Sequence, residues 1–340
     1  MASTRLWCAK RIGSAFVATE PEQEVTALSE RVRIAAIDIG SDTVHLLIAD
    51  VTGSPDGPLV RDVEQRGELI ELGRRVATTG AVGKRAATQL EAILVRYLKV
   101  GRRGGDRVVI GATEALRRAT DGPALVARLS GELGEPVRVL SGAKEAALGL
   151  AGVVHRLDPA GTQLLIDSGG ASTEVTITDG RRAVAAASLP VGAALLGAEL
   201  RGDPPAALGW ALAGVRIGAA LSLAPAGKPS RAWATGGSAH NLAGLERTRG
   251  RSGDQCLAMA ELSTLAARLL ADPARKLARR SDEDPARVAI LPPGLLIIAA
   301  ILAHYGLDEL TVVPEGLRQG MIAAAFENGA GWWQDPPPKR

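Results

Sequence analysis

Two stretches of this chain share one unusual pattern: an apolar strand ends on an aspartate, turns through small residues and resumes as a second strand. The first is IAAIDIGSDTVHLLIAD, residues 34–50, and the second is LLIDSGGASTEV, residues 164–175. An Asp-Gly turn and a further extended segment follow each of them. A chain that restarts in this way predicts a duplicated architecture, in which two related domains face each other across a cleft.

The rest of the chain has the pattern of layered α/β structure. Strand-like runs alternate with helical stretches such as 84–99 and 123–133, which is typical of sheets covered by helices. Strands are expected at 34–39, 44–51, 107–112, 136–140, 164–167 and 174–178, and further helices at 206–222, 255–271, 292–304 and 316–327. We predict an N-terminal extension (1–33), two domains (34–148 and 149–330, the last helix being able to pack back on the first domain) and a disordered tail (331–340).

Length, net charge, cysteine content and apolar runs argue against several classes of protein. The 340 residues accommodate two domains, and the net charge of +3 gives no support for nucleic-acid binding. Cys8 and Cys256 form neither a disulfide framework nor a metal-binding spacing. The longest apolar run, GLLIIAAILAHYG, is shorter than a membrane span, and the N-terminus lacks the apolar region of a signal peptide. We therefore expect a cytoplasmic protein with no nucleic-acid or membrane partner.

The two turns have the chemistry of phosphate-binding loops. Their glycines let the backbone approach an anion, their N–H and hydroxyl groups can donate to its oxygens, and the adjacent Asp38 or Asp167 can hold Mg²⁺ or orient water. Either turn alone could be a polar hairpin turn, but the occurrence of one at the head of each half favours phosphate binding. Other phosphate motifs are absent, because GAVGKRA lacks the spacing of a P-loop and no G-x-G-x-x-G follows a strand.

A third feature is the stretch VLSGAKEAALGLAGV, in which a strand ends, Ser141-Gly142 turns and a helix begins with Glu145 in its first turn. An acidic residue near a helix N-terminus can simply compensate the helix dipole, which contributes up to ~1 kcal/mol. The same carboxylate at a domain junction could instead be a general base that takes a proton from a water attacking phosphorus. The residues alone leave both readings open.

Taken in order, these motifs resemble the Ppx/GppA family of exopolyphosphatases and guanosine pentaphosphatases. The matching segments are AAIDIGSDTVHLLIAD, GATEALRRA, LSGAKEAALGLAGV, IDSGGASTEV, SLPVGAALL, ATGGSAHNLAGL and VPEGLRQGMI, which together run from about 34 to 327. The resemblance implies two ribonuclease-H-like domains (the actin-like ATPase fold) that face each other across an interdomain cleft. Each domain would contribute one phosphate loop.

The resemblance also implies roles for individual residues. Glu145 matches the family's catalytic glutamate, and Arg117 matches an arginine beside the transferred phosphate. Asp38, Asp167 and Glu174 would hold or organise Mg²⁺ and water. The expected phosphate-binding residues are Gly40, Ser41, Asp42 and Thr43 in the first loop and Gly169, Gly170, Ser172 and Thr173 in the second. Gly236 and Gly237 fall where relatives approach a nucleotide.

This chain departs from the family pattern close to the expected site. Asp42 stands where an asparagine is usual, and Ala171 where a third glycine is usual. If that position requires φ > 0, Ala171 costs about 1 kcal/mol and crowds the phosphate. Lys144, Ala147 and Ala289 replace an acid, an arginine and an aspartate of the family pattern. A weakly active or non-catalytic member is therefore one of the possible outcomes.

We expect a Mg²⁺-dependent phosphoanhydride hydrolase that releases terminal phosphate from inorganic polyphosphate. Short chains are favoured, since the sequence ends without the C-terminal helical domain of longer relatives. One alternative is hydrolysis of guanosine pentaphosphate or another nucleoside polyphosphate at the same site. Another is a regulatory protein that binds polyphosphate or an alarmone with little turnover. The resemblance also suggests a homodimer.

Overall fold

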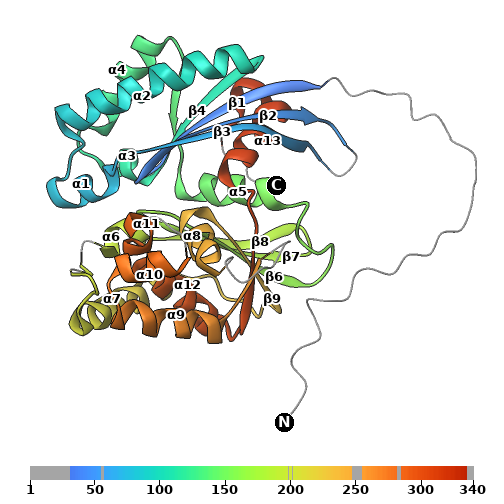
Figure 1. The fold of residues 1–340 in the computed structure, drawn as a ribbon. Helices are drawn as coiled ribbons and strands as arrows, with labels where there is room; N and C mark the ends of the chain where they lie inside the picture. The colour runs from blue at the N-terminus through green and yellow to red at the C-terminus, as the bar shows by residue number, and fades with distance from the viewer. Residues whose placement is uncertain are drawn as a thin grey trace, which may run out of the picture.

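The computed structural model describes residues 31–54, 57–197, 199–200, 202–246, 255–281 and 285–334. Two α/β domains lie one above the other in Figure 1, the first containing β1–β5 and the second β6–β11. Each domain is built on one mixed sheet, with five strands in the first and six in the second. This confirms the predicted α/β class with two domains.

The first sheet has the strand order β3-β2-β1-β4-β5. Its strands are β1 (Val32–Ile39), β2 (Thr43–Thr52), β3 (Leu59–Leu69), β4 (Arg107–Ala112) and β5 (Val137–Val139). The helices of this half are α1 (Leu72–Thr79), α2 (Gly83–Gly104), α3 (Glu114–Arg118), α4 (Gly122–Leu133) and α5 (Gly142–Val153). β1 pairs antiparallel with β2 and parallel with β4, so the strand that ends on the first aspartate lies at the centre of the sheet.

The second sheet has the order β10-β11-β9-β6-β7-β8. Its strands are β6 (Thr162–Ser168), β7 (Thr173–Asp179), β8 (Arg182–Leu189), β9 (Arg231–Thr235), β10 (Gln255–Ala258) and β11 (Glu309–Val312). The helices are α6 (Ala193–Gly197), α7 (Ala207–Leu221), α8 (Gly236–Glu246), α9 (Met259–Ala271), α10 (Ala274–Ser281), α11 (Pro285–Ala289), α12 (Leu291–Tyr305) and α13 (Leu317–Asn328). The order β8-β7-β6-β9-β11 repeats that of the first sheet, which is the duplication that the sequence predicted.

Two helices join the domains. α13, at the end of the described chain, leaves the second domain and packs on the first, beside β1 and α5 (Figure 1). Met321 and Ile322 of α13 share a buried cluster with Ile34, Ala36 and Leu47 of the first sheet. The expected domain boundary between residues 148 and 149 falls inside α5, which packs against both α13 and β8. The junction is therefore helical and tightly packed.

Two expectations for local structure are corrected. The stretch 255–271 is not one helix, because Gln255–Ala258 form β10 and pair with β11 before α9 begins at Met259. Residues 331–334, expected in a disordered tail, pack on the first domain. Trp332 is 4% exposed, and the guanidinium of Arg138 lies 4.6 Å from the ring centre of Trp333.

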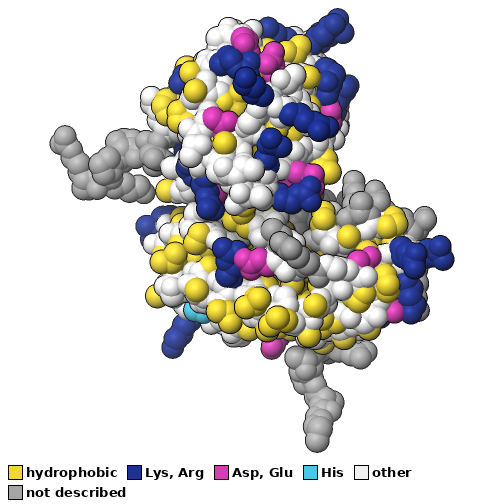
Figure 2. Space-filling view, turned by 90° about the vertical axis from the view of Figure 1, so that its left-hand side faces the viewer, with side chains coloured by type: hydrophobic (Ala, Val, Ile, Leu, Met, Phe, Trp, Pro, Cys, Tyr) yellow, Lys and Arg dark blue, Asp and Glu magenta, His cyan; other side chains and the backbone are white. Residues whose placement is uncertain are grey.

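The surfaces of the two domains differ. Figure 2 shows lysine and arginine side chains spread over the first domain and many hydrophobic side chains on the second. The second domain also has exposed apolar side chains on α7, where Leu208 is 71% and Val215 72% exposed. Within the described residues, no helix is both long and apolar enough to cross a membrane.

Candidate active site

The two sequence-predicted turns have the same geometry. Asp38 is the penultimate residue of β1, and Asp167 is the penultimate residue of β6. In the first turn Gly40 N donates to Thr43 O at 3.1 Å, and in the second Gly169 N donates to Ser172 O, also at 3.1 Å. A glycine two residues after each aspartate therefore closes an equivalent turn in both domains.

The two turns also face and touch each other. A Cβ atom placed on Gly170 would lie 2.5 Å from Oδ2 of Asp42 and 3.0 Å from Cβ of Ser41. A larger residue at position 170 would push against both side chains of the first loop. The structure thus brings together the first and second loops as the sequence predicted.

The carboxyl groups of Asp38 and Asp167 are both buried, and their charges interact. Burial raises the pKa of each carboxyl to about 6, the charge of Arg318 opposes this rise in both, and Asp167 further raises the pKa of Asp38. The Oδ1 atom of Asp38 is buried and has no hydrogen-bond partner among the described residues. A buried carboxylate oxygen without a partner is costly in a folded protein unless a ligand satisfies it.

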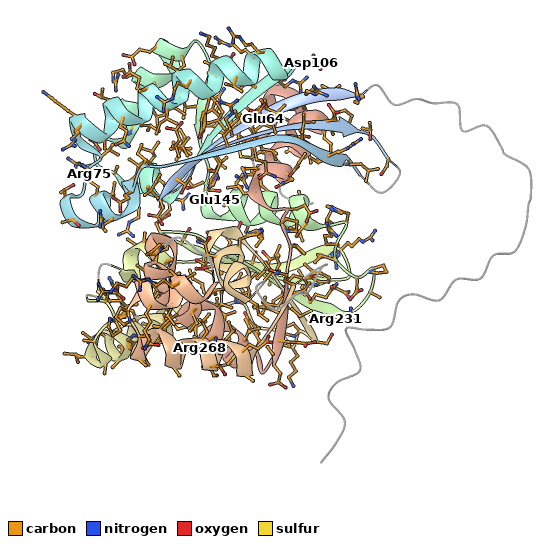
Figure 3. All side chains as sticks on the ribbon, viewed as in Figure 1. Glu64, Arg75, Asp106, Glu145, Arg231 and Arg268 are labelled. Carbon is orange, nitrogen blue, oxygen red and sulfur yellow. The ribbon has the colours of Figure 1, made fainter. Side chains whose placement is uncertain are left out.

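Glu145 lies in the first turn of α5 at the junction of the domains, where it is labelled in Figure 3. The helix begins at Ser141, whose Oγ accepts a hydrogen bond from Lys144 N at 3.1 Å. Glu145 is 6% exposed, and burial raises the pKa of its carboxyl, as do the nearby charges of Glu174 and Asp38, while the Arg117 guanidinium lowers it. The Glu145 carboxyl therefore interacts electrostatically with acidic residues of both domains. Compensation of the helix dipole alone would not require this placement.

Arg117 is committed to holding Glu145. Its Nη1 donates to the Glu145 carboxylate and to the carbonyl of Leu140, and its Nη2 donates to the carboxylate of Glu114. These bonds join α3 to the start of α5. Arg117 therefore holds the Glu145 carboxylate in place from α3.

Glu174 faces Asp167 across the β6–β7 pair and Ser188 across the β7–β8 pair. Ser188 Oγ donates to Glu174 Oε1 at 2.6 Å. Burial raises the pKa of the Glu174 carboxyl, the charge of Asp167 adds to the rise, and the hydroxyl of Ser188 lowers it. Glu174 thus adds a third acidic group beside Glu145 and Asp167.

Thr173 and Ala171 of the second loop are both buried. Thr173 is fully buried and its Oγ1 donates to Val191 O at 2.7 Å, so this hydroxyl supports the loop instead of facing the cleft. Ala171 is 3% exposed, and Glu71 is the one non-glycine residue with positive φ in the described chain. The backbone strain considered for Ala171 is therefore absent. Gly236 has φ +86° and lies against Asp167 and Ser168.

One charged residue of the site was not assigned from the sequence. Arg318, the second residue of α13, acts electrostatically on both Asp38 and Asp167. It lies in the motif VPEGLRQGMI, far along the chain from either loop. The signal in the sequence was an arginine two residues after Gly316, in a segment already matched to the family.

The donor set fits Mg²⁺. Among the residues that the structure describes, no three His, Cys, Asp or Glu side chains form a metal-binding cluster. Mg²⁺ in phosphate-transfer sites is held by one or two carboxylates together with water and substrate oxygens, so a full protein cage is not needed. Asp38, with its unpartnered oxygen, and Asp167 supply that minimum.

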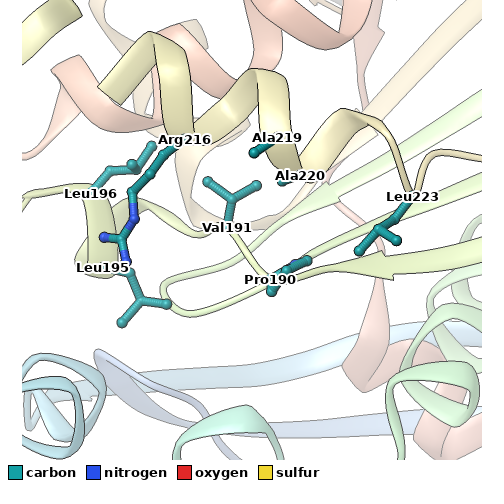
Figure 4. A pocket seen from close by; sticks show the side chains of 8 residues that line it. All are labelled: Pro190, Val191, Leu195, Leu196, Arg216, Ala219, Ala220 and Leu223. Atoms are coloured by element: carbon teal, nitrogen blue, oxygen red, sulfur yellow. The ribbon is translucent and has the colours of Figure 1, made fainter. Parts of the chain in front are cut away.

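A separate hollow in the second domain does not fit a phosphate. Figure 4 shows its lining, which comes from the end of β8, from α6 and from α7. The lining side chains are aliphatic except for Arg216, and the guanidinium of Arg216 is ion-paired with Glu199. Its chemistry therefore differs from that of the two loops.

Comparison with known proteins agrees with the geometry. The model of the Ppx/GppA phosphatase family matches residues 48–328. Exopolyphosphatase 2 of Mycobacterium tuberculosis is 26% identical over 311 residues, which is 85% of this chain and 97% of that protein. The Guanosine-5'-triphosphate,3'-diphosphate pyrophosphatase of Vibrio cholerae serotype O1 is 26% identical over 329 residues, 85% of this chain and 58% of that protein.

A solved structure is also similar. The crystal structure of the Aquifex aeolicus member of the Ppx/GppA protein family has a TM-score of 0.74 and 26% sequence identity. The match covers 88% of this chain and 100% of the Aquifex aeolicus chain. The resemblance drawn from the ordered motifs is therefore confirmed.

Proposed function

Because this chain belongs to the Ppx/GppA phosphatase family and is a hydrolase acting on phosphoanhydrides, we propose that it releases terminal phosphate from inorganic polyphosphate with Mg²⁺ as cofactor. The observation that carries the proposal is the meeting of two equivalent aspartate loops beside a buried glutamate. Gly170 lies against Asp42 and Ser41, and Glu145 is electrostatically coupled to Asp38 and Glu174.

The proposed reaction is attack of water on the terminal phosphorus. The water oxygen forms the new bond to phosphorus as the bridging P–O bond breaks, and the shortened chain leaves with the bridging oxygen. Glu145 takes the proton of the attacking water. Burial raises the pKa of this carboxyl, which makes the ionised form a stronger base, while the Arg117 ion pair favours the ionised form.

The remaining groups bind and orient the substrate. Backbone N–H groups of the glycine turns would donate to phosphate oxygens, because glycine has no side chain that keeps an anion away from the backbone. Asp38 and Asp167 would hold Mg²⁺, with Glu174 beside them to orient water. When bound, Mg²⁺ supplies charge neutralisation and in-line alignment of the phosphate groups.

We propose short polyphosphate as the preferred form of the substrate. The net charge of +3 on 340 residues provides little long-range attraction for a long polyanion. The second candidate is a guanosine pentaphosphate, and it is supported by the Vibrio cholerae relative named Guanosine-5'-triphosphate,3'-diphosphate pyrophosphatase. A cytoplasmic location and a homodimer, both expected from the sequence and the family resemblance, remain part of this proposal.

One experiment separates these possibilities. Purified protein is supplied with Mg²⁺ and with tripolyphosphate, long-chain polyphosphate, guanosine pentaphosphate or ATP, and released phosphate is measured. Fastest release from tripolyphosphate supports the proposal, and fastest release from guanosine pentaphosphate supports the second candidate. Tight binding of tripolyphosphate with no release from any substrate would instead support a regulatory binding protein.

A further inference from the structure

The last described residues of the chain pack beside the helix that carries Glu145. Residues 329–334, here called the C-terminal segment, follow α13, and α13 itself packs on α5 and β1. Nη1 of Arg107, on β4, donates to the carbonyl of Ala325 near the end of α13. The C-terminal segment therefore starts from a helix end that is fixed to the first sheet.

Two tryptophans anchor the C-terminal segment to the first domain. Trp332 is 4% exposed and shares a buried cluster with Leu140 and Leu148, one just before α5 and one within it. The guanidinium of Arg138, on β5, lies 4.6 Å from the ring centre of Trp333. A guanidinium over the face of an aromatic ring is an attractive contact. The two tryptophans therefore hold the C-terminal segment beside β5 and α5.

A buried lysine in the first turn of α5 binds the same segment. Lys144 is 8% exposed, and its Nζ donates to the carbonyl of Gln334 at 2.7 Å. An ammonium group taken out of water is costly unless hydrogen bonds satisfy it, so the bond to Gln334 compensates part of the cost of burial. An acid, which the family pattern has at this position, could not donate such a bond.

Lys144 and Glu145 share one anchor at the start of the helix. The main-chain N–H of Lys144 donates to Ser141 Oγ at 3.1 Å, and that of Glu145 donates to Ser141 O at 2.9 Å. The Glu145 carboxylate is held separately by Arg117, on α3. The start of α5 is therefore fastened in two ways, through the lysine side chain to the C-terminal segment and through the glutamate side chain to α3.

We propose that Lys144 is a positioning residue for Glu145, and that the C-terminal segment is the fixed support to which Lys144 binds. This inference rests on the proposed function, in which Glu145 takes the proton of the attacking water. The bond from Lys144 to Gln334 fixes the first turn of α5, and with it the place from which the Glu145 carboxylate reaches the water. A catalytic group must be held within about 0.5 Å of its productive position, so a loosened helix start lowers the rate.

The test separates turnover from substrate affinity in matched variants. Lys144→Met removes the donor and keeps a long side chain, Lys144→Arg keeps a charged donor, and Lys99→Met, at an exposed position of α2, is the charge-matched control. Hydrolysis of tripolyphosphate is measured at saturating Mg²⁺, at a temperature where circular dichroism shows each variant folded. Lys144→Met should lower kcat by about 10- to 100-fold with KM little changed, because a misplaced base slows the chemical step. Lys144→Arg should recover part of kcat, and Lys99→Met should match the wild type.

Trp333→Ala reaches the same bond from its other end, because it releases the C-terminal segment from Arg138. It also stands in for Lys144→Met if that variant does not fold. If both substitutions act through the bond to Gln334, the double variant should lose about as much kcat as the more affected single variant, and not the product of the two losses.

Hydrogen exchange adds a measurement that needs no turnover. The N–H groups of Lys144 and Glu145 should exchange about 10-fold or more faster in Lys144→Met and in Trp333→Ala than in Lys99→Met, since the loss of a hydrogen bond to a charged group loosens the helix start.

The outcomes distinguish the inference from the function on which it rests. If the wild type hydrolyses tripolyphosphate and both Lys144→Met and Trp333→Ala keep its kcat, the inference alone fails. A kcat loss that Lys144→Arg does not relieve and that comes with an equal rise in KM would indicate a merely structural lysine, and would also overturn it. If the wild type releases no phosphate from any substrate, the proposed function fails and the exchange rates decide. Faster exchange at Lys144 and Glu145 then still supports the positioning, and unchanged exchange overturns it.

Discussion

Asp42 offers the sharpest quantitative test of the meeting of the two loops. Its carboxylate lies against Gly170 of the opposite domain, and its main-chain carbonyl accepts from Ile70 N and Glu71 N. Burial raises the pKa of this carboxyl from 3.8 to about 6, the charge of Glu71 adds to the rise, and Arg74 opposes it. The folded protein therefore holds the Asp42 proton more tightly than the unfolded chain does.

The sign and size of the effect follow from this difference. Below pH 3.8 Asp42 is neutral in both states, and as the pH rises through about 6 the folded state must accept a charge that it disfavours. The rise of the Asp42 pKa from 3.8 to about 6 corresponds to a loss of folding free energy of at most ~3 kcal/mol at neutral pH. Because the side chain is partly exposed to solvent, we expect ~1–2 kcal/mol.

Asp42→Asn removes this cost, since the amide has the shape of the neutral acid and no charge to bury. The free energy of unfolding from urea titrations should be the same for both proteins near pH 4 and higher for the variant by ~1–2 kcal/mol at pH 7.5. Asp179→Asn, at the exposed end of β7, is the charge-matched control. A constant difference between wild type and Asp42→Asn across this pH range would refute the burial of the Asp42 carboxylate between the loops.

Three further outcomes are expected from the site and the junction. Glu145→Gln keeps the size of the side chain and should lower kcat by ~10²–10⁴ with unchanged circular dichroism, and an unchanged kcat would return Glu145 to a helix-dipole role. Asp167→Asn should raise the Mg²⁺ concentration for half-maximal activity more than it lowers Tm, because a hard cation needs the anionic oxygen; equal losses would indicate a structural aspartate. Trp332→Ala should lower the free energy of unfolding by ~3 kcal/mol in urea titrations, whereas a change near zero would show that the last segment does not contribute to the core.

The duplicated fold was readable from the sequence because its signal is local. An aspartate at the end of an apolar strand, followed two residues later by a glycine, specifies a strand and its turn within a few positions. Asp38 with Gly40 and Asp167 with Gly169 meet that description, and both turns close with the same hydrogen bond. The antiparallel pairs β1–β2–β3 and β6–β7–β8 then follow from short connections between strands that are neighbours in the chain.

The misread segments depend on partners far along the chain. Gln255–Ala258 become a strand only because β11 lies beside them, and the local pattern continues smoothly into α9. Trp332 is buried by strands and helices from the first domain, although its own surroundings in the sequence resemble a disordered tail. The backbone conformation of Ala171 was equally beyond local reasoning, because one position in a turn can take several conformations until its neighbours are known.

The same distinction explains why Arg318 was not assigned to the site from the sequence. Arg117 and Arg318 both lie in matched motifs, and the sequence alone does not say which groups surround each of them. Glu114 and Glu145 engage Arg117 only in the folded chain. The strand pairing likewise puts His45 opposite Asp38, where the second domain has Glu174 opposite Asp167. Two domains that share one turn geometry therefore build an asymmetric site. The first contributes His45 and Asp42 and the second contributes Glu174, so the two sides of the cleft carry different groups.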